Sequence, residues 1–154
     1  MVLEAFRDAE EIYNWCYYTD FPKDREDVLL RPNGEYHRVL HPELNSVDEL
    51  RFYLKTLFSD ELVDALVGSV EYPKFLDGEN GGLYVYDIDG RPDDYGPKER
   101  TSLLVIWSEE EPVRCTVQVV QRTGYPEEEA EQTYEFPYQK VGDKWVFTDF
   151  DPTF

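Results

Sequence analysis

The sequence holds 154 residues, of which 34 are acidic and 15 basic, so its formal charge at pH 7 is −19. This charge repels phosphate backbones and anionic lipid head groups, which argues against nucleic acid and membrane surfaces as partners. A chain of this length supports one hydrophobic core, and we therefore expect a single domain over residues 1–154.

The N-terminal part of the chain has helical periodicity. Apolar residues recur at spacings of four and three from Val2 to Cys16, which predicts an amphipathic helix. Prolines and many charges over residues 19–34 predict a loop, and a short strand is expected at residues 35–40.

Two further helices are indicated by their capping residues. Ser46 followed by Glu49 has the pattern of a capping box, so a helix is expected over residues 47–58. Ser59 is placed to cap another helix, which should end at Gly68. The first 68 residues are thus expected to be mainly helical.

Downstream of Gly68 the period of the apolar pattern changes to two, which predicts strands. They are expected at residues 83–88, 103–107, 113–122, 132–138 and 145–150. Short connections leave little room for parallel crossovers, so a mostly antiparallel sheet is expected over residues 69–154. The predicted class is α+β, with the N-terminal helices packed on one face of a curved sheet, in a hot-dog-like, cystatin-like or nuclear-transport-factor-like (NTF2-like) arrangement.

The two cysteines, Cys16 and Cys115, match no zinc or redox spacing. Each falls in an apolar pattern, so buried free thiols are expected, with a single helix-to-sheet disulfide as the alternative. The chain has no apolar run of about 18 residues, and it opens directly into a helical pattern without the features of a signal peptide. A cytoplasmic protein and a mature exported protein both remain open.

Catalytic chemistry finds little support in the sequence. Histidine is the side-chain type that serves most often as a general acid or base near neutrality, and the sequence has two, His37 and His41. On an extended segment their side chains lie about 13 Å apart, too far to share a metal ion. One histidine is expected to face solvent and the other to lie in a loop. Hydrolase and phosphate-loop motifs are missing from the sequence, so we assign no catalytic residue, metal or cofactor.

The acidic stretch that begins at Asp87 invites comparison with a calcium-binding EF-hand loop. The comparison fails, because the fifth, sixth and twelfth positions are Arg91, Pro92 and Lys98. A solvated turn after a strand is the better interpretation, with a weak surface ion site as the alternative.

With no catalytic, phosphate-loop or EF-hand motif in the sequence, the acidic turns are its strongest local features. Runs of charge are usually solvated loops, but such turns could also form an anionic rim that docks on a basic surface. The candidate partner-binding residues are Asp87, Asp89, Asp93, Asp94, Glu109, Glu110, Glu111, Glu127, Glu128 and Glu129. The expected partner is a basic protein, because opposite electrostatic potentials on two proteins speed their association. The alternative is that the acidity serves only to keep the protein soluble.

Four segments, at residues 9–15, 49–59, 83–85 and 141–147, read AEEIYNW, ELRFYLKTLFS, LYV and VGDKWVF. In their order along the chain and in their general residue pattern, these segments resemble the sequences of the IseA-type inhibitors of bacterial cell-wall DL-endopeptidases. The resemblance implies a secreted, non-enzymatic protein of a Gram-positive bacterium with a hot-dog-like fold. It also implies that the protein blocks NlpC/P60-type cysteine peptidases at their basic substrate groove. We accordingly expect a monomer that is extracellular or in the cell wall if the resemblance holds, and otherwise cytoplasmic.

Two other functions stay open. The closing pattern of Gly142, Trp145 and Phe147 is also common in NTF2-like domains, which bind small molecules or act as isomerases or dehydratases. That function predicts a buried pocket with convergent polar groups, whereas an inhibitor predicts a filled interior and an acidic outer cleft. A cytosolic acidic partner of a basic toxin or of a nucleic-acid-binding protein would share the charge without needing export.

Overall fold

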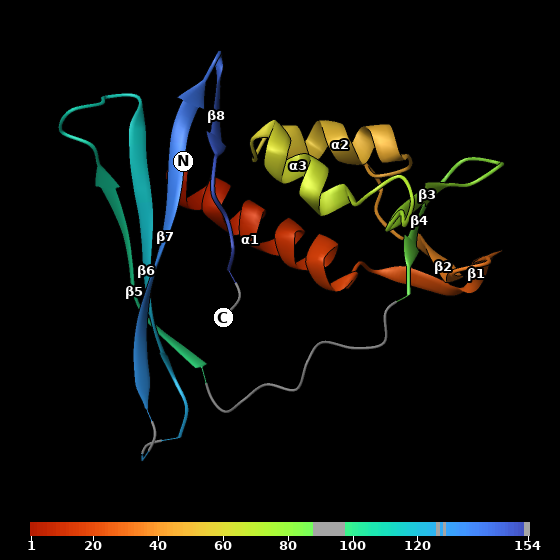
Figure 1. Cartoon of the computed structure of the whole chain (residues 1–154), viewed down its shortest axis with the longest axis horizontal. Coiled ribbons are helices and arrows are strands. Elements are labelled where there is room, and N and C mark those ends of the chain that lie inside the picture. The colour runs from red at the N-terminus through yellow and green to blue at the C-terminus, as the bar shows by residue number, and fades with distance from the viewer. Residues whose placement is uncertain (88–97, 126, 128, 153–154) are drawn as a thin grey trace.

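The computed structural model describes residues 1–87, 98–125, 127 and 129–152, which form three helices and two four-stranded sheets (Figure 1). The elements are α1 (Val2–Tyr18), β1 (Lys23–Arg31), β2 (Gly34–Val39), α2 (Val47–Lys55), α3 (Asp60–Val67), β3 (Phe75–Asp77), β4 (Leu83–Tyr86), β5 (Lys98–Trp107), β6 (Arg114–Thr123), β7 (Ala130–Val141) and β8 (Lys144–Phe147). This composition confirms the predicted α+β class.

The strands form two sheets rather than the single curved sheet that was predicted. Sheet A has the order β1-β2-β4-β3 and sheet B the order β5-β6-β7-β8, and the neighbours described in both sheets are antiparallel. The prediction of one sheet was wrong because the sequence reveals strands but not their partners. In the described residues β4 pairs with β2 and β3, and β5 starts a separate meander.

Of the two serines expected to cap helices, Ser46 acts as predicted, whereas the Ser59 side chain makes no capping bond within the described residues. The Ser46 hydroxyl accepts a hydrogen bond from the Glu49 N–H at 3.0 Å, which fixes the start of α2. The Glu49 carboxylate accepts from the N–H of Asn45 at 2.7 Å, one residue before the position that a capping box would use. Helix α2 ends at Lys55, before the predicted boundary at residue 58.

The predicted loop over residues 19–34 was wrong, because β1 occupies most of it. Pro22 precedes this strand and Pro32 lies in the turn to β2, so neither proline interrupts the ladder. Strand β1 lies at the edge of sheet A and has a register shift after Asp24, and its exposure follows no period of two. The first 68 residues therefore contain two strands beside the helices.

One hydrophobic core joins the helices to both sheets. Near the start of α1 the Phe6 ring lies 5.3 Å from the Phe136 ring of sheet B, and just after α1 the Phe21 ring lies 5.6 Å from the Phe75 ring of sheet A. Figure 1 shows α1 running from one sheet toward the other. The helix and the residues just after it thus pack against both sheets.

The connection between α2 and α3 extends the edge of sheet B. The Ser59 N–H donates to the Phe147 carbonyl at 2.9 Å, and the Phe147 N–H donates to the Leu57 carbonyl at 2.8 Å. This short parallel pairing fixes the two small helices against β8. Across the described residues, no helix has the length and apolar character needed to cross a membrane.

Candidate functional site

The acidic turns lie at opposite ends of sheet B. Glu109, Glu110 and Glu111 stand before the first residue of β6, whereas Glu127 and Glu129 follow its last residue. Figure 1 shows the two turns at opposite ends of the strand. Since β6 has 10 residues, they are about 30 Å apart. The described acids of both turns are exposed, but they form two separate acidic tips instead of one rim.

The acidic stretch that follows β4 is described only at its first member. Asp87 has a side chain that is 18% exposed, and its carboxylate accepts a hydrogen bond from the Lys23 ammonium at 3.2 Å. This pairing makes Asp87 part of an internal cluster and not a free docking residue. Asp89, Asp93, Asp94 and Glu128 lie outside the described residues.

A pocket of about 470 Å³ beside α2 combines acidic and aromatic side chains. We call it the acid-rimmed pocket. Its lining residues are Glu43, Leu44, Asp48, Glu49, Phe52, Tyr53 and Thr56. Leu44 is buried at its base, while Phe52 is 72% exposed and stands among three exposed carboxylates.

The electrostatic environment of the acid-rimmed pocket is negative on more than one side. Burial raises the pKa of the Tyr53 hydroxyl, and the carboxylates of Asp8, Glu11 and Glu43 raise that pKa further. Asp8 and Glu11 belong to α1, so the negative potential extends from α2 onto the neighbouring helix. A ligand for this surface would need a cationic group beside an apolar one.

The local sequence explains this arrangement. Helical spacing turns Leu50 and Leu54 into the core and leaves Phe52 on the outer face, four residues after Asp48 and on the same side of the helix. The helix was predicted, but Phe52 was not singled out as a binding residue. The available signal was a large aromatic residue outside the apolar stripe of an amphipathic helix.

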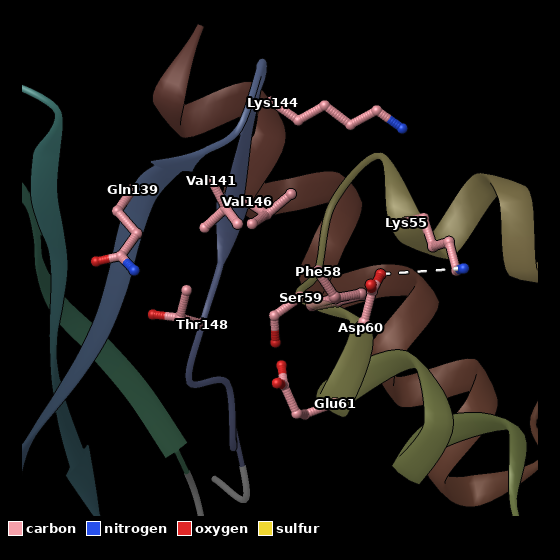
Figure 2. A pocket seen from close by; sticks show the side chains of 10 residues that line it. All are labelled: Lys55, Phe58, Ser59, Asp60, Glu61, Gln139, Val141, Lys144, Val146 and Thr148. Carbon is pink, nitrogen blue, oxygen red and sulfur yellow. Dashed lines mark ion pairs between the residues drawn. The ribbon is translucent and has the colours of Figure 1, made fainter.

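Another pocket has a volume of about 470 Å³. It lies between the α2–α3 connection and the β7–β8 hairpin (Figure 2). Its lining residues are Lys55, Phe58, Ser59, Asp60, Glu61, Gln139, Val141, Lys144, Val146 and Thr148. The Lys55 ammonium lies 4.0 Å from the Asp60 carboxylate, and the pair faces the pocket from the helical side. Its lysines and acids together make it less suited to a basic partner than the acid-rimmed pocket.

The two histidines have different environments. His41 lies after β2 as expected of a loop residue, and its Nδ1 accepts a hydrogen bond from the Glu43 N–H at 3.2 Å. His37 on β2 is only 4% exposed, so the expectation that the strand histidine faces solvent was wrong. Its Nε2 lies 3.4 Å from an Asp87 carboxylate oxygen and 3.5 Å from a Glu35 carboxylate oxygen. Cross-strand pairing, which the sequence does not reveal, produces this cluster.

Both cysteines are buried and free, as predicted. Burial raises the pKa of the Cys16 thiol to about 12 and also raises the pKa of the Cys115 thiol. The thiolate is the nucleophilic form of cysteine, so neither side chain is suited to act as a nucleophile at neutral pH.

The chain matches no protein-family model, and no curated protein matches its sequence.

Proposed function

We propose that this protein is a non-enzymatic binding module that docks an acidic surface on a basic protein. The observation that carries the proposal is the exposure of Phe52, at 72%, among the carboxylates of Glu43, Asp48 and Glu49. An exposed aromatic ring in a concave acidic setting provides the apolar anchor of an interface, and the surrounding charges select a cationic partner.

The chemistry of the partner follows from the pocket. A lysine or arginine of the partner can lay its aliphatic stem or its charged head on the Phe52 ring while the head pairs with Glu43 or Asp48. The formal charge of −19 adds a long-range attraction that speeds encounter with any basic surface. The two acidic tips of sheet B contribute to this attraction from outside the pocket.

We further propose that the partner is an NlpC/P60-type DL-endopeptidase of the bacterial cell wall, and that docking on its basic substrate groove inhibits it. The target class rests on the resemblance to IseA-type inhibitors, and it implies action outside the cell or in the cell wall. A monomer is sufficient for this role, because one acid-rimmed pocket can occupy one groove.

The packing of the interior favours a binding module over the NTF2-like alternative. A ligand-binding domain of that kind needs an open cavity between its helix and its curved sheet. Here the space between α1 and sheet B holds Phe6, Phe136, Phe147 and Phe150, each at most 1% exposed. This filled interior supports recognition through an outer surface.

The decisive experiment measures inhibition of purified NlpC/P60 DL-endopeptidases on peptidoglycan at about 0.05 M and 0.5 M salt. Saturable inhibition that weakens at the higher salt is expected. Phe52→Ala and Glu43→Lys should each raise the inhibition constant at least about tenfold, the loss typical of an interface anchor. Tyr72→Ala and Glu71→Lys make matched changes at exposed positions away from the pocket and should leave inhibition unchanged.

Other outcomes are equally informative. If neutralising Glu109, Glu110 and Glu111 abolishes inhibition while Phe52→Ala has no effect, the docking surface is the acidic tip and not the pocket. If the folded protein inhibits none of several such peptidases, the proposed target class is wrong.

A further inference from the structure

We propose that Glu35, His37 and Asp87 form a binding site for a divalent transition-metal ion, and that Zn²⁺ fits it best. One carboxylate oxygen from each of Glu35 and Asp87 and one imidazole nitrogen of His37 all lie within 4.8 Å of one another. The proposal is independent of the proposed partner, because the cluster belongs to sheet A and shares no residue with the acid-rimmed pocket.

The strand register holds the three side chains together. In the antiparallel pairing of β2 and β4, Tyr36 is opposite Tyr86, and the Asp87 N–H donates to the Glu35 carbonyl at 3.0 Å. Glu35 and Asp87 are therefore neighbours across the ladder, and directly opposed residues share a face. His37 is two residues from Glu35 along β2, so it lies on that face too.

The buried imidazole of His37 provides an independent sign of a ligand. The side chain is only 5% exposed, and within the described part of the chain neither of its ring nitrogens has a hydrogen-bond partner. Nε2 instead lies almost equally far from two carboxylate oxygens, at 3.4 Å and 3.5 Å, without the alignment of a hydrogen bond to either. A buried polar atom without a partner destabilises the fold, and a metal ion bound between these groups would remove that cost at Nε2.

The distances suit a small tetrahedral ion. Zn²⁺ binds imidazole nitrogen and carboxylate oxygen at about 2.0–2.2 Å, so neighbouring ligand atoms in a tetrahedron lie about 3.3–3.6 Å apart. The two distances from His37 Nε2 have this length. The Glu35 side chain is 58% exposed, so it has room to rotate and bring its oxygen closer to that of Asp87.

The mixed ligand set indicates which ions the site would take. Ca²⁺ and Mg²⁺ prefer oxygen ligands alone, whereas imidazole combined with carboxylates suits Zn²⁺ and similar transition metals. Three protein ligands leave a fourth position for water or for a group from a partner.

The Lys23 ammonium holds the Asp87 carboxylate in place from one side of the proposed metal site. It donates to one Asp87 oxygen at 3.2 Å and to the Thr19 carbonyl at 3.1 Å, which leaves the other Asp87 oxygen facing His37. Hydrogen bonds of this kind orient metal-binding carboxylates. The competing occupant is a proton, since a protonated His37 would form ion pairs with both carboxylates.

The test is a calorimetric titration of the folded protein with Zn²⁺ in a large excess of Mg²⁺, which saturates the exposed carboxylates. One equivalent of Zn²⁺ is expected to bind. Glu35→Gln and Asp87→Asn should each weaken binding by about tenfold or more, because even outer-shell changes at metal sites cost about 10- to 100-fold. His41→Gln and the triple change of Glu109, Glu110 and Glu111 to Gln are the matched controls and should leave the affinity unchanged.

A spectroscopic measurement connects the binding to one side chain. Zn²⁺ should shift the ¹⁵N resonance of His37 Nε2 and leave the ring resonances of His41 in place, and Co²⁺ should give the visible absorption of a low-symmetry, four-coordinate site.

If His37→Asn fails to fold, Glu35→Gln at an exposed position still decides the question. The proposal is overturned if no saturable binding occurs or if Glu35→Gln and Asp87→Asn bind Zn²⁺ as tightly as the original protein. Peptidase inhibition by Glu35→Gln should be unaffected, because Glu35 lies outside the acid-rimmed pocket and the acidic turns, so the two proposals can fail separately.

Discussion

The ring of Phe6 on α1 lies 5.3 Å from the ring of Phe136 on β7, and both side chains are at most 1% exposed. The rings of Phe147 and Phe150 also lie within 6.2 Å of the Phe6 ring, so aromatic rings from β7, β8 and the segment after β8 surround the start of α1. This contact connects the first residues of the chain to some of its last. Phe6 therefore packs the start of the helix against sheet B.

Phe6→Ala is expected to lower the free energy of unfolding by about 3–5 kcal/mol, because it removes a buried ring and leaves a cavity among other rings. Urea denaturation followed by circular dichroism measures the loss. Phe52→Ala is the matched control, since its ring is 72% exposed and its removal should change stability by less than about 0.5 kcal/mol. Equal losses in the two variants would contradict the assigned core.

The cap of α2 provides a second test. Ser46→Ala removes the hydrogen bond from the Glu49 N–H to the serine hydroxyl and is expected to cost about 1 kcal/mol of stability. Ser59 precedes α3, but its side chain makes no capping bond within the described residues. Ser59→Ala should therefore cost clearly less in the same denaturation experiment, and a larger loss than that of Ser46→Ala would contradict the assignment.

The class of the fold could be predicted from the sequence because periodicity and capping act locally. The amphipathic pattern of α1 and the alternation in β6 appear in the sequence itself, since each element turns one side toward the core. Strand β1 was missed because its exposure has no regular alternation and its register against β2 shifts after Asp24, and β3 is only 3 residues long. The division into two sheets depends on pairing between distant segments, which local patterns do not specify.

The candidate sites were harder to predict for the same reason. His37 was compared with His41 because the two are close in sequence, whereas its neighbours in space are Glu35 and Asp87. Only the register of β2 against β4 brings Asp87 to it. The acidic turns were found easily, since they are contiguous runs of one residue type, but their positions at opposite ends of β6 could not be read from the sequence.

The reactivity of the cysteines should report on the integrity of the core. Burial raises the pKa of Cys16 to about 12, so almost no thiolate forms at pH 8 in the folded protein. Ellman's reagent should therefore react slowly with the native protein and rapidly with both thiols in denaturant. Rapid reaction of one thiol under native conditions would place that cysteine at the surface, and failure to react in denaturant would indicate a disulfide.

The buried tyrosines predict a loss of stability at alkaline pH. Burial is the largest cause that raises the pKa of Tyr13 from 10.0 to about 12, and the nearby carboxylate of Asp151 raises it further. The unfolded chain therefore loses this proton at lower pH than the folded chain does, and Tyr13 contributes stability that is complete below pH 10 and lost as the pH rises toward 12. Denaturation at several pH values between 9 and 12 should show that the free energy of unfolding falls less steeply with pH for Tyr13→Phe than for the original protein.

Tyr125→Phe, at a side chain that is 65% exposed, is the control and should leave this pH dependence unchanged. If both variants follow the pH dependence of the original protein, the loss of stability comes from other groups, and the environment assigned to Tyr13 is wrong.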